Sequence, residues 1–176
     1  MASASTVDFV QILLYHAGMN IFVLDESPLK AAQQHCDKHV VKMVTETAQM
    51  LSTAKVAMGL EAPYRPTHKN HPCTLWVTQS SENYYWAWNL GYALGEEYTH
   101  RYGKTHKAWL KFSEGHLDLP DDIVFPQEGL TPFAQAMPDE YRQENAVQAY
   151  RDYYLGEKAH LLQFKNREVP DWIEGL

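Results

Sequence analysis

The strongest constraint on the fold is a helical pattern about 30 residues long, which begins at Pro28 and ends near Met58. Ser27 is a residue type that caps helices, Pro28 suits the first helical position, and Gly59 supplies a stop. We therefore predict one long helix over residues 28–58.

Helical spacing returns in four other segments, which are separated by prolines, glycines and serines. They cover residues 6–17, 72–102 with a break at Ser80–Ser81, 105–114 and 144–164. Residues 19–25 form a short apolar run that can be a strand, although a single strand has nothing to pair with. The predicted fold class is mainly α: a single-domain irregular helical bundle with at most one short β-strand pair.

The chain has 176 residues, 45% of them apolar, which is enough for one core and short for two. We expect residues 1–18 to be an N-terminal extension with a short helix, and residues 19–176 to be a single helical domain. Met19 is an equally sensible start, so the extension is expected to be dispensable. The longest apolar stretch, residues 9–15, is far shorter than the roughly 18 residues of a membrane span, so no membrane partner is expected.

The net charge is −7 and no run of lysine and arginine occurs, so the sequence gives little support for nonspecific binding to the phosphates of duplex DNA. We expect any nucleic-acid contact to be local, and the charge favours a small ligand over duplex DNA. Two cysteines and the lack of a secretory signal predict a reducing compartment.

Five polar residues follow one another at steps of four, three, four and three within the long helical pattern: His35, His39, Lys42, Glu46 and Gln49. This spacing places all five along one side of a helix. A solvated face is the ordinary explanation of such a stripe. Asp37 and Lys38 add polar side chains in other directions at the same turn, which favours a site at the edge of the core.

A second polar cluster, His68, Lys69, Asn70 and His71, lies in a loop stiffened by prolines. Two histidines three residues apart can ligate a metal, act as acid and base, or bond to the backbone of a turn. Pro72 biases His71 toward extended geometry and holds its imidazole at a helix entrance, where free backbone N–H groups attract anions.

A third cluster surrounds Gly103, which is expected to end a helix. Glu97 and Arg101 are four residues apart and should form an ion pair, and this pair is a sufficient reason for both residues to be present. An arginine, a lysine and a histidine at one turn, namely Arg101, Lys104 and His106, also suit an anionic group such as phosphate.

A zinc site is an alternative use of some of these residues. Cys36 and His39 are three apart on the predicted helix, and His71 and Cys73 lie close together on the loop, which makes a Cys2His2 set conceivable. The spacing matches no established zinc motif, and buried free cysteines often act only as small apolar residues. The chain also lacks a Gly-rich phosphate loop, a GxSxG elbow and a dinucleotide fingerprint, so P-loop kinases, serine hydrolases and Rossmann oxidoreductases are poor candidates.

Several motifs resemble those of a family of small tailed-bacteriophage proteins, over nearly all of residues 19–172. They are MNIFVLDESP at 19–28, HCDKHVVKM at 35–43, ETAQML at 46–51, THKNHP at 67–72, RYGKTH at 101–106 and AQAMP at 134–138. The resemblance implies a phage setting, hence the cytoplasm of an infected bacterium, and implies no particular activity. It places within family motifs most of the polar residues that spacing had singled out.

The leading hypothesis is a phage enzyme, a phosphodiesterase or other hydrolase, that acts on a nucleotide, a cyclic nucleotide or a nucleic-acid end. His39 with His71 or His68 would be acid and base, with Glu46 as a further catalytic candidate. The predicted ligand-binding residues are Asp37, Lys38, Lys42, Asn70, Arg101, Lys104 and His106.

Three alternatives stay open at this point. One is a non-catalytic module that sequesters a small anionic ligand or a host protein without chemistry. Another is a zinc-dependent hydrolase. The last is a base-modifying transferase or glycosylase on phage DNA. The sequence requires no cofactor, allows zinc, and leaves the oligomeric state open.

Overall fold

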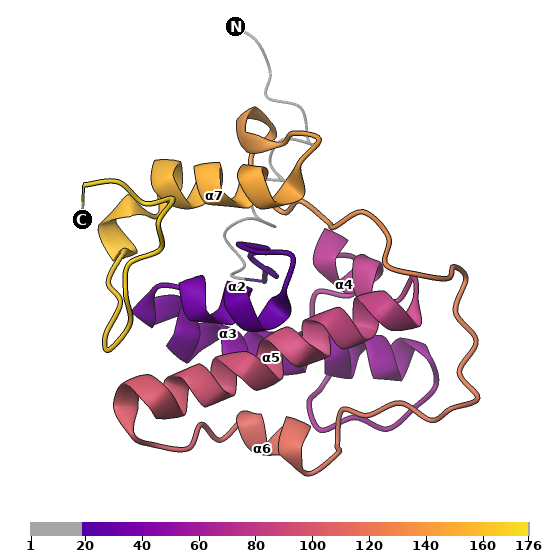
Figure 1. The fold of residues 1–176 in the computed structure, drawn as a ribbon. Coiled ribbons are helices and arrows are strands. Elements are labelled where there is room, and N and C mark those ends of the chain that lie inside the picture. The colour runs from indigo at the N-terminus through magenta and orange to yellow at the C-terminus, as the bar shows by residue number, and fades with distance from the viewer. Residues whose placement is uncertain (1–18, 176) are drawn as a thin grey trace, which may run out of the picture.

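The computed structural model describes residues 19–175, which fold into six α-helices and two short 3-10 helices (Figure 1). The α-helices are α2 (Pro28–Gln34), α3 (Asp37–Ala57), α4 (Pro72–Val77), α5 (Ser81–Tyr102), α6 (Trp109–Ser113) and α7 (Ala146–Glu157), and the 3-10 helices are η1 (Asp139–Tyr141) and η2 (Ala159–Leu161). The predicted helix at residues 6–17 lies outside the described residues. A mainly helical single domain is confirmed.

The two longest helices, α3 and α5, pack along each other and form the centre of the bundle, with α2 and α6 against α5 and α4 against α3 (Figure 1). A small residue permits the close approach of α6. A Cβ atom added at Gly91 of α5 would lie 2.3 Å from Phe112 Cζ and 2.9 Å from Thr47 Cγ2, so a larger side chain would separate the three helices.

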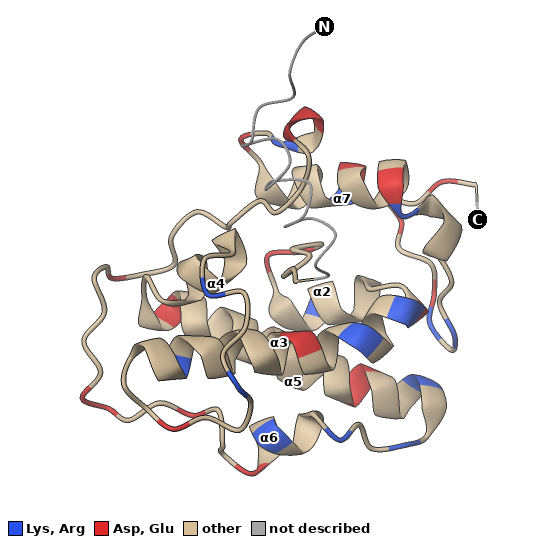
Figure 2. Ribbon diagram, turned by 180° about the vertical axis from the view of Figure 1, so that it is seen from behind, with Lys and Arg blue, Asp and Glu red and all other residues tan. Residues whose placement is uncertain are grey.

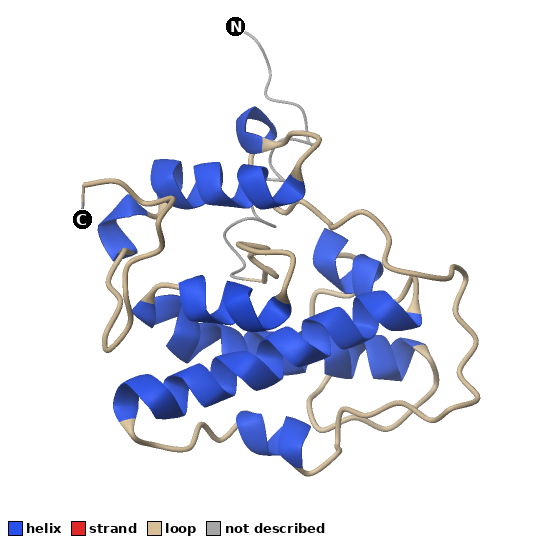
Figure 3. Cartoon of the chain, in the orientation of Figure 1, coloured by secondary structure: helices blue, strands red, loops and turns tan. Residues whose placement is uncertain are grey.

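No strand occurs in residues 19–175 (Figure 3), so the optional strand pair is wrong for this part of the chain. Residues 19–25 form a buried irregular loop instead. The Asn20 side chain accepts hydrogen bonds from the amides of Ile21 and Phe22, and Phe22 has a φ of +32°, which an extended strand excludes. This loop lies between α7 and the α2–α3 pair, where Phe22 contacts Tyr150 and Tyr154 of α7.

The prediction of one helix over residues 28–58 is also wrong, because two helices meet at a break. His35 and Cys36 are extended, with ψ of 138° and 157°, and α3 begins afresh at Asp37. The backbone groups freed by the break find tertiary partners. The Cys36 amide donates to the Tyr154 hydroxyl and the Asp37 amide donates to the Gln163 carbonyl.

Other predicted boundaries agree more closely with the structure. Ser80 caps α5 by accepting from the Asn83 amide, and Gly103 ends α5 with a left-handed φ of 68°. The last two predicted helices are shorter than expected, and Trp172 docks the tail through a hydrogen bond to Gln34. Among the helices of residues 19–175 there is no candidate for a membrane-spanning segment.

A buried arginine holds the α2–α3 break in place. The Arg101 side chain, on the last turn of α5, donates to the carbonyls of Gln33 and His35 and to the carboxylates of Asp37 and Glu97. Arg101 is only 1% exposed. One guanidinium therefore joins the end of α2, the start of α3 and the end of α5.

We expect Arg101→Met to lower the free energy of unfolding by about 3 kcal/mol, because it leaves buried carbonyls and carboxylates without their donor. For a chain of this size that corresponds to a fall in Tm of about 10 °C. The matched control is Arg142→Met, which removes an exposed ion pair with Asp139 and should cost less than about 1 kcal/mol. Equal losses in the two variants, measured by urea unfolding, would contradict a central role for Arg101.

Candidate active site on helix α3

The predicted polar stripe is present on α3, except that His35 lies in the break before the helix. His39, Lys42 and Glu46 follow one another along the helix and differ in depth. The side chain of Lys42 is 49% exposed and that of Glu46 is 15% exposed, whereas His39 is 5% exposed. Lys42 Nζ lies 3.5 Å from Glu46 Oε1. We call these three residues, together with Tyr154 and Lys158 of the α7 region, the His39 site.

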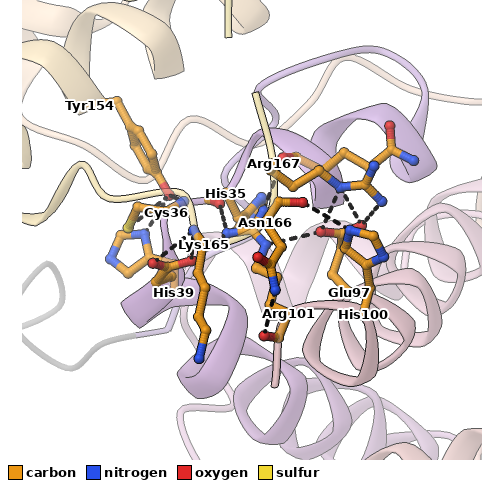
Figure 4. Close-up of polar contacts among 12 residues, drawn as sticks. His35, Cys36, His39, Glu97, His100, Arg101, Tyr154, Lys165, Asn166 and Arg167 are labelled. Carbon is orange, nitrogen blue, oxygen red and sulfur yellow. Dashed lines mark hydrogen bonds and ion pairs between the residues drawn. The ribbon is translucent and has the colours of Figure 1, made fainter. Parts of the chain in front are cut away.

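The fold sets the tautomer of His39. Tyr154 Oη lies 2.6 Å from His39 Nδ1, and it already accepts a hydrogen bond from the Cys36 amide (Figure 4). The phenolic proton therefore points to Nδ1, because the short distance makes that nitrogen a better acceptor than the Cys36 sulfur at 3.6 Å. This arrangement leaves the imidazole proton on Nε2.

Two aromatic rings hold the plane of the His39 imidazole. Phe22 stacks on it with ring centroids 4.4 Å apart, and Tyr153 stacks on Phe22 at 6.3 Å. Both aromatic residues are at most 5% exposed, so they are part of the packing that fixes the imidazole.

Burial lowers the pKa of His39 to about 2, and the positive charges of His35, Lys158, Lys42 and Lys38 act in the same direction. His39 is therefore neutral at pH 7. It can offer an N–H group as a hydrogen-bond donor without carrying a charge.

The pKa of Glu46 is shifted in the opposite direction, upward. Burial raises its pKa to about 7, against the lowering effect of the neighbouring Lys42. Its Oε2 atom is buried and has no hydrogen-bond partner within residues 19–175. A carboxyl group that titrates near neutrality can act as a general acid or base.

Three lysines, two of them members of the site, lie around His39. Burial and then repulsion from Lys42 lower the pKa of Lys158, whose ammonium lies 5.3 Å from the centroid of the Tyr153 ring. Lys38 is exposed on the first turn of α3, next to His39. Figure 2 shows basic segments on α3, with an acidic segment among them. The positive charge is therefore local in a chain whose net charge is −7.

The second predicted cluster is divided by the structure. His68 and Asn70 are exposed, and the loop is tied to the far end of α3 by hydrogen bonds between Thr67 and Thr53. His71 is buried and caps α4, because its Nδ1 accepts from the Cys73 amide. Its Nε2 therefore carries the proton, and it has no partner in the described part of the chain. Burial, and next the charge of His68, lower the pKa of His71 to about 4.

The third cluster has two parts. The predicted pair of Glu97 and Arg101 is present at 3.0 Å, and Glu97 also pairs with Arg167 (Figure 4). The guanidinium of Arg101 is buried and donates to protein acceptors, so it is directed away from an external ligand. His106 bonds to the Val41 carbonyl and brings the turn that holds the exposed Lys104 next to α3.

The four residues of the zinc alternative do not form one group. Within residues 19–175, no set of three or more His, Cys, Asp or Glu side chains is arranged to hold a metal. The Cys36 sulfur lies 3.6 Å from the Tyr154 hydroxyl, beside His39. Cys73 instead contacts the Tyr150 hydroxyl, and burial raises its pKa to about 12.

Sequence reasoning did not find Phe22, Tyr154 or Lys158. Phe22 belongs to an apolar run that looked like a strand, and the other two lie in the last helical segment, more than 100 residues from His39. The sequence signal for Tyr154 and Lys158 was a pair of neighbouring tyrosines with a lysine four residues later.

One comparison with known proteins, that with protein families, found a match. A family described as pyrimidine dimer DNA glycosylase matches residues 19–111, more than half of the chain. The chain belongs to the pyrimidine dimer DNA glycosylase family. No curated protein and no solved structure matched the chain.

The match favours one of the functions that the sequence left open, the base-modifying glycosylase on DNA, over the prediction of an enzyme for small nucleotides. It also favours contact with nucleic acid. The matched residues include His39, Lys42, Glu46 and His71, whereas Tyr154 and Lys158 lie beyond them. The resemblance to tailed-phage proteins stays a prediction.

The three buried histidines should make the fold sensitive to acid. Burial lowers the pKa values of His35 and His71 to about 4 and that of His39 to about 2. The unfolded chain binds these protons below pH 6.5 and the folded chain does not, so stability is full above pH 6.5 and falls toward pH 4. Glu46 has the opposite effect on stability, because its raised pKa makes the folded chain bind one proton more than the unfolded chain in this pH range.

We expect the free energy of unfolding to fall by about 2 to 3 kcal/mol per pH unit near pH 5. Urea titrations between pH 7 and pH 4.5 measure this slope. His116, whose side chain is half exposed, is the control position, and His116→Ala should leave the slope as it is. A stability that does not change between pH 7 and pH 5 would show that these imidazoles are not buried in the neutral form.

Proposed function

We propose that the chain is a DNA glycosylase that cleaves the N-glycosidic bond of a pyrimidine dimer at the His39 site. The observation that carries the proposal is the family match, because the matched residues include His39, Lys42 and Glu46. The geometry of these residues supports it, since a neutral N–H donor and a carboxyl with a pKa of about 7 lie on the same side of one helix.

The first requirement of this reaction is to stabilise the departing base. When the bond between C1′ and N1 breaks, its electron pair moves onto the pyrimidine, and the negative charge is shared with O2. The Nε2–H group of His39 is suited to donate to that oxygen. Its position is fixed in advance by Tyr154 and Phe22, so little reorganisation is needed during the reaction.

The second requirement is to stabilise the sugar, which gains positive charge at C1′. The Glu46 carboxylate can stabilise this charge and take the proton of a water molecule whose oxygen forms the new bond to C1′. The departing base takes up one proton in exchange, so the net reaction is hydrolysis. Lys42 next to Glu46 favours the ionised carboxylate that this step needs.

The third requirement is to hold the DNA backbone near the reacting sugar. Lys38, Lys42 and Lys158 place ammonium groups around His39, and phosphate contacts of this kind position a protein on DNA without reading sequence. A setting in phage-infected bacteria would place the reaction in the host cytoplasm, where phage DNA is exposed to damage.

The direct test uses a labelled duplex that carries one cyclobutane thymine dimer. We expect the wild-type chain to create an alkali-sensitive site at the dimer, detected on a denaturing gel, and to leave an undamaged duplex intact. His39→Ala should lower the single-turnover rate at least about 100-fold, because the donor to the departing base is lost.

The matched control for His39→Ala is Gln49→Ala, on the same side of α3, which should retain the wild-type rate. The Tm of each variant shows whether it is folded. If the folded wild-type chain produces no alkali-sensitive site at the dimer, the proposed function is wrong. If His39→Ala cleaves as fast as the wild type, the role of His39 is wrong.

Glu46→Gln tests the carboxylate by pH dependence. The wild-type rate should rise with pH through about 7 as Glu46 ionises, whereas the variant should be slow and show no such rise. The variant should also have a higher Tm than the wild type at pH 8, where it removes a buried charge, and this difference should become much smaller at pH 5, closer to the pKa of 4.5 that Glu46 has in the unfolded chain. A pH profile shared by variant and wild type would exclude Glu46 as the titrating group.

A further inference from the structure

Three exposed lysines, Lys104, Lys107 and Lys165, lie near the C-terminal end of α5, outside the His39 site. Lys104 and Lys107 belong to the turn that follows Gly103. Lys165 belongs to the tail segment, which returns to the same end of α5 after η2. We call these three residues the lysine edge.

The turn that carries Lys104 and Lys107 is held rigidly. The Thr99 hydroxyl donates to the Lys104 carbonyl, and His106 is fixed by the Ala108 amide on one ring nitrogen and the Val41 carbonyl on the other. The His106 ring also packs edge-on against Tyr98 at 4.9 Å. The two lysines therefore project from a fixed backbone, on either side of a histidine that is docked on α3.

The tail segment is fixed just as firmly. The Lys165 amide donates to both carboxylate oxygens of Asp37, and its ammonium lies 5.1 Å from the centroid of the Tyr102 ring. The next residue, Asn166, accepts from His100 and donates to the Arg101 carbonyl. These contacts hold the Lys165 ammonium beside the last residue of α5, next to Gly103.

None of the three lysines forms an ion pair with a carboxylate among residues 19–175. The chain has 22 acidic residues against 15 basic ones, so acidic partners are not scarce. Two carboxylates of this region, Asp37 and Glu97, are already bonded to Arg101, and Asp37 also accepts from the Lys165 amide. Cations left unpaired on a rigid surface of an acidic protein indicate an external polyanion.

The lysine edge continues the positive surface of α3. His106 contacts the backbone at Val41, which lies between the exposed Lys38 and Lys42 in the sequence. Figure 2 shows basic segments gathered at this end of the bundle, on α3 and on the loop that leads from α5 to α6. The acidic residues of the 114–128 connector belong to a different part of the surface.

We propose that the lysine edge binds the phosphate backbone of duplex DNA beside the His39 site. The inference rests on the proposed function for its choice of partner. Lysines without carboxylate partners, carried by a backbone that hydrogen bonds hold in place, suit a line of phosphates, which is recognised through charge. The Asp37 bonds also give the edge a fixed place relative to His39, two residues along α3.

The test measures binding of an undamaged 25-base-pair duplex by fluorescence anisotropy at several KCl concentrations. The variant Lys104→Gln/Lys165→Gln is compared with the wild type and with a control of equal charge, Lys30→Gln/Arg65→Gln, at exposed positions elsewhere. Each lost phosphate contact should reduce the slope of log Kd against log [KCl] by about 0.9. We therefore expect a slope smaller by about 2 in the edge variant and a wild-type slope in the control.

A wild-type slope in the folded edge variant would overturn the proposal. So would binding to phosphatidylglycerol vesicles that the edge variant loses while its duplex binding stays the same, because the edge would then be a membrane contact. Since undamaged DNA is not cleaved, this result is independent of excision. A chain that binds through the edge and never cleaves dimers would refute the glycosylase proposal alone.

Discussion

The Arg101 guanidinium reaches from the last turn of α5 to the carbonyls of Gln33 and His35, where the chain leaves α2. Without a donor at this point, an extended break between two helices would leave buried carbonyls unpaired. The same group pairs with Asp37, the first residue of α3, and Glu97 and Arg167 complete the network. The direction of α3, and hence the position of His39 on its first turn, depends on this arrangement.

Burial shifts the pKa values of His39 and Glu46 in opposite directions. It keeps His39 neutral and raises the pKa of Glu46 to about 7, so the site combines an uncharged donor with a carboxyl that ionises near physiological pH. The lysines around them strengthen the first effect and oppose the second. The chemistry of the proposed reaction therefore follows from the depth of each side chain on α3 and from the cations that surround it.

Much of the fold could be predicted from the sequence, because its helices are delimited by residues with strong local preferences. Ser80 and Gly103 mark both ends of α5, and the pair of Glu97 and Arg101 followed from their spacing. The α2–α3 break was not predictable, because no proline or glycine marks His35 or Cys36. It exists because distant side chains, Arg101 and Tyr154, satisfy the backbone there.

For the candidate site, the sequence by itself determined which polar residues share a side of α3, because helical periodicity follows from local backbone geometry. His39, Lys42 and Glu46 were found in this way. Only the tertiary structure decided their partners and depth. It placed Tyr154 and Lys158 of the α7 region beside His39 and turned Arg101 inward, because long-range packing and electrostatics, which no local pattern encodes, set the environment of each charge.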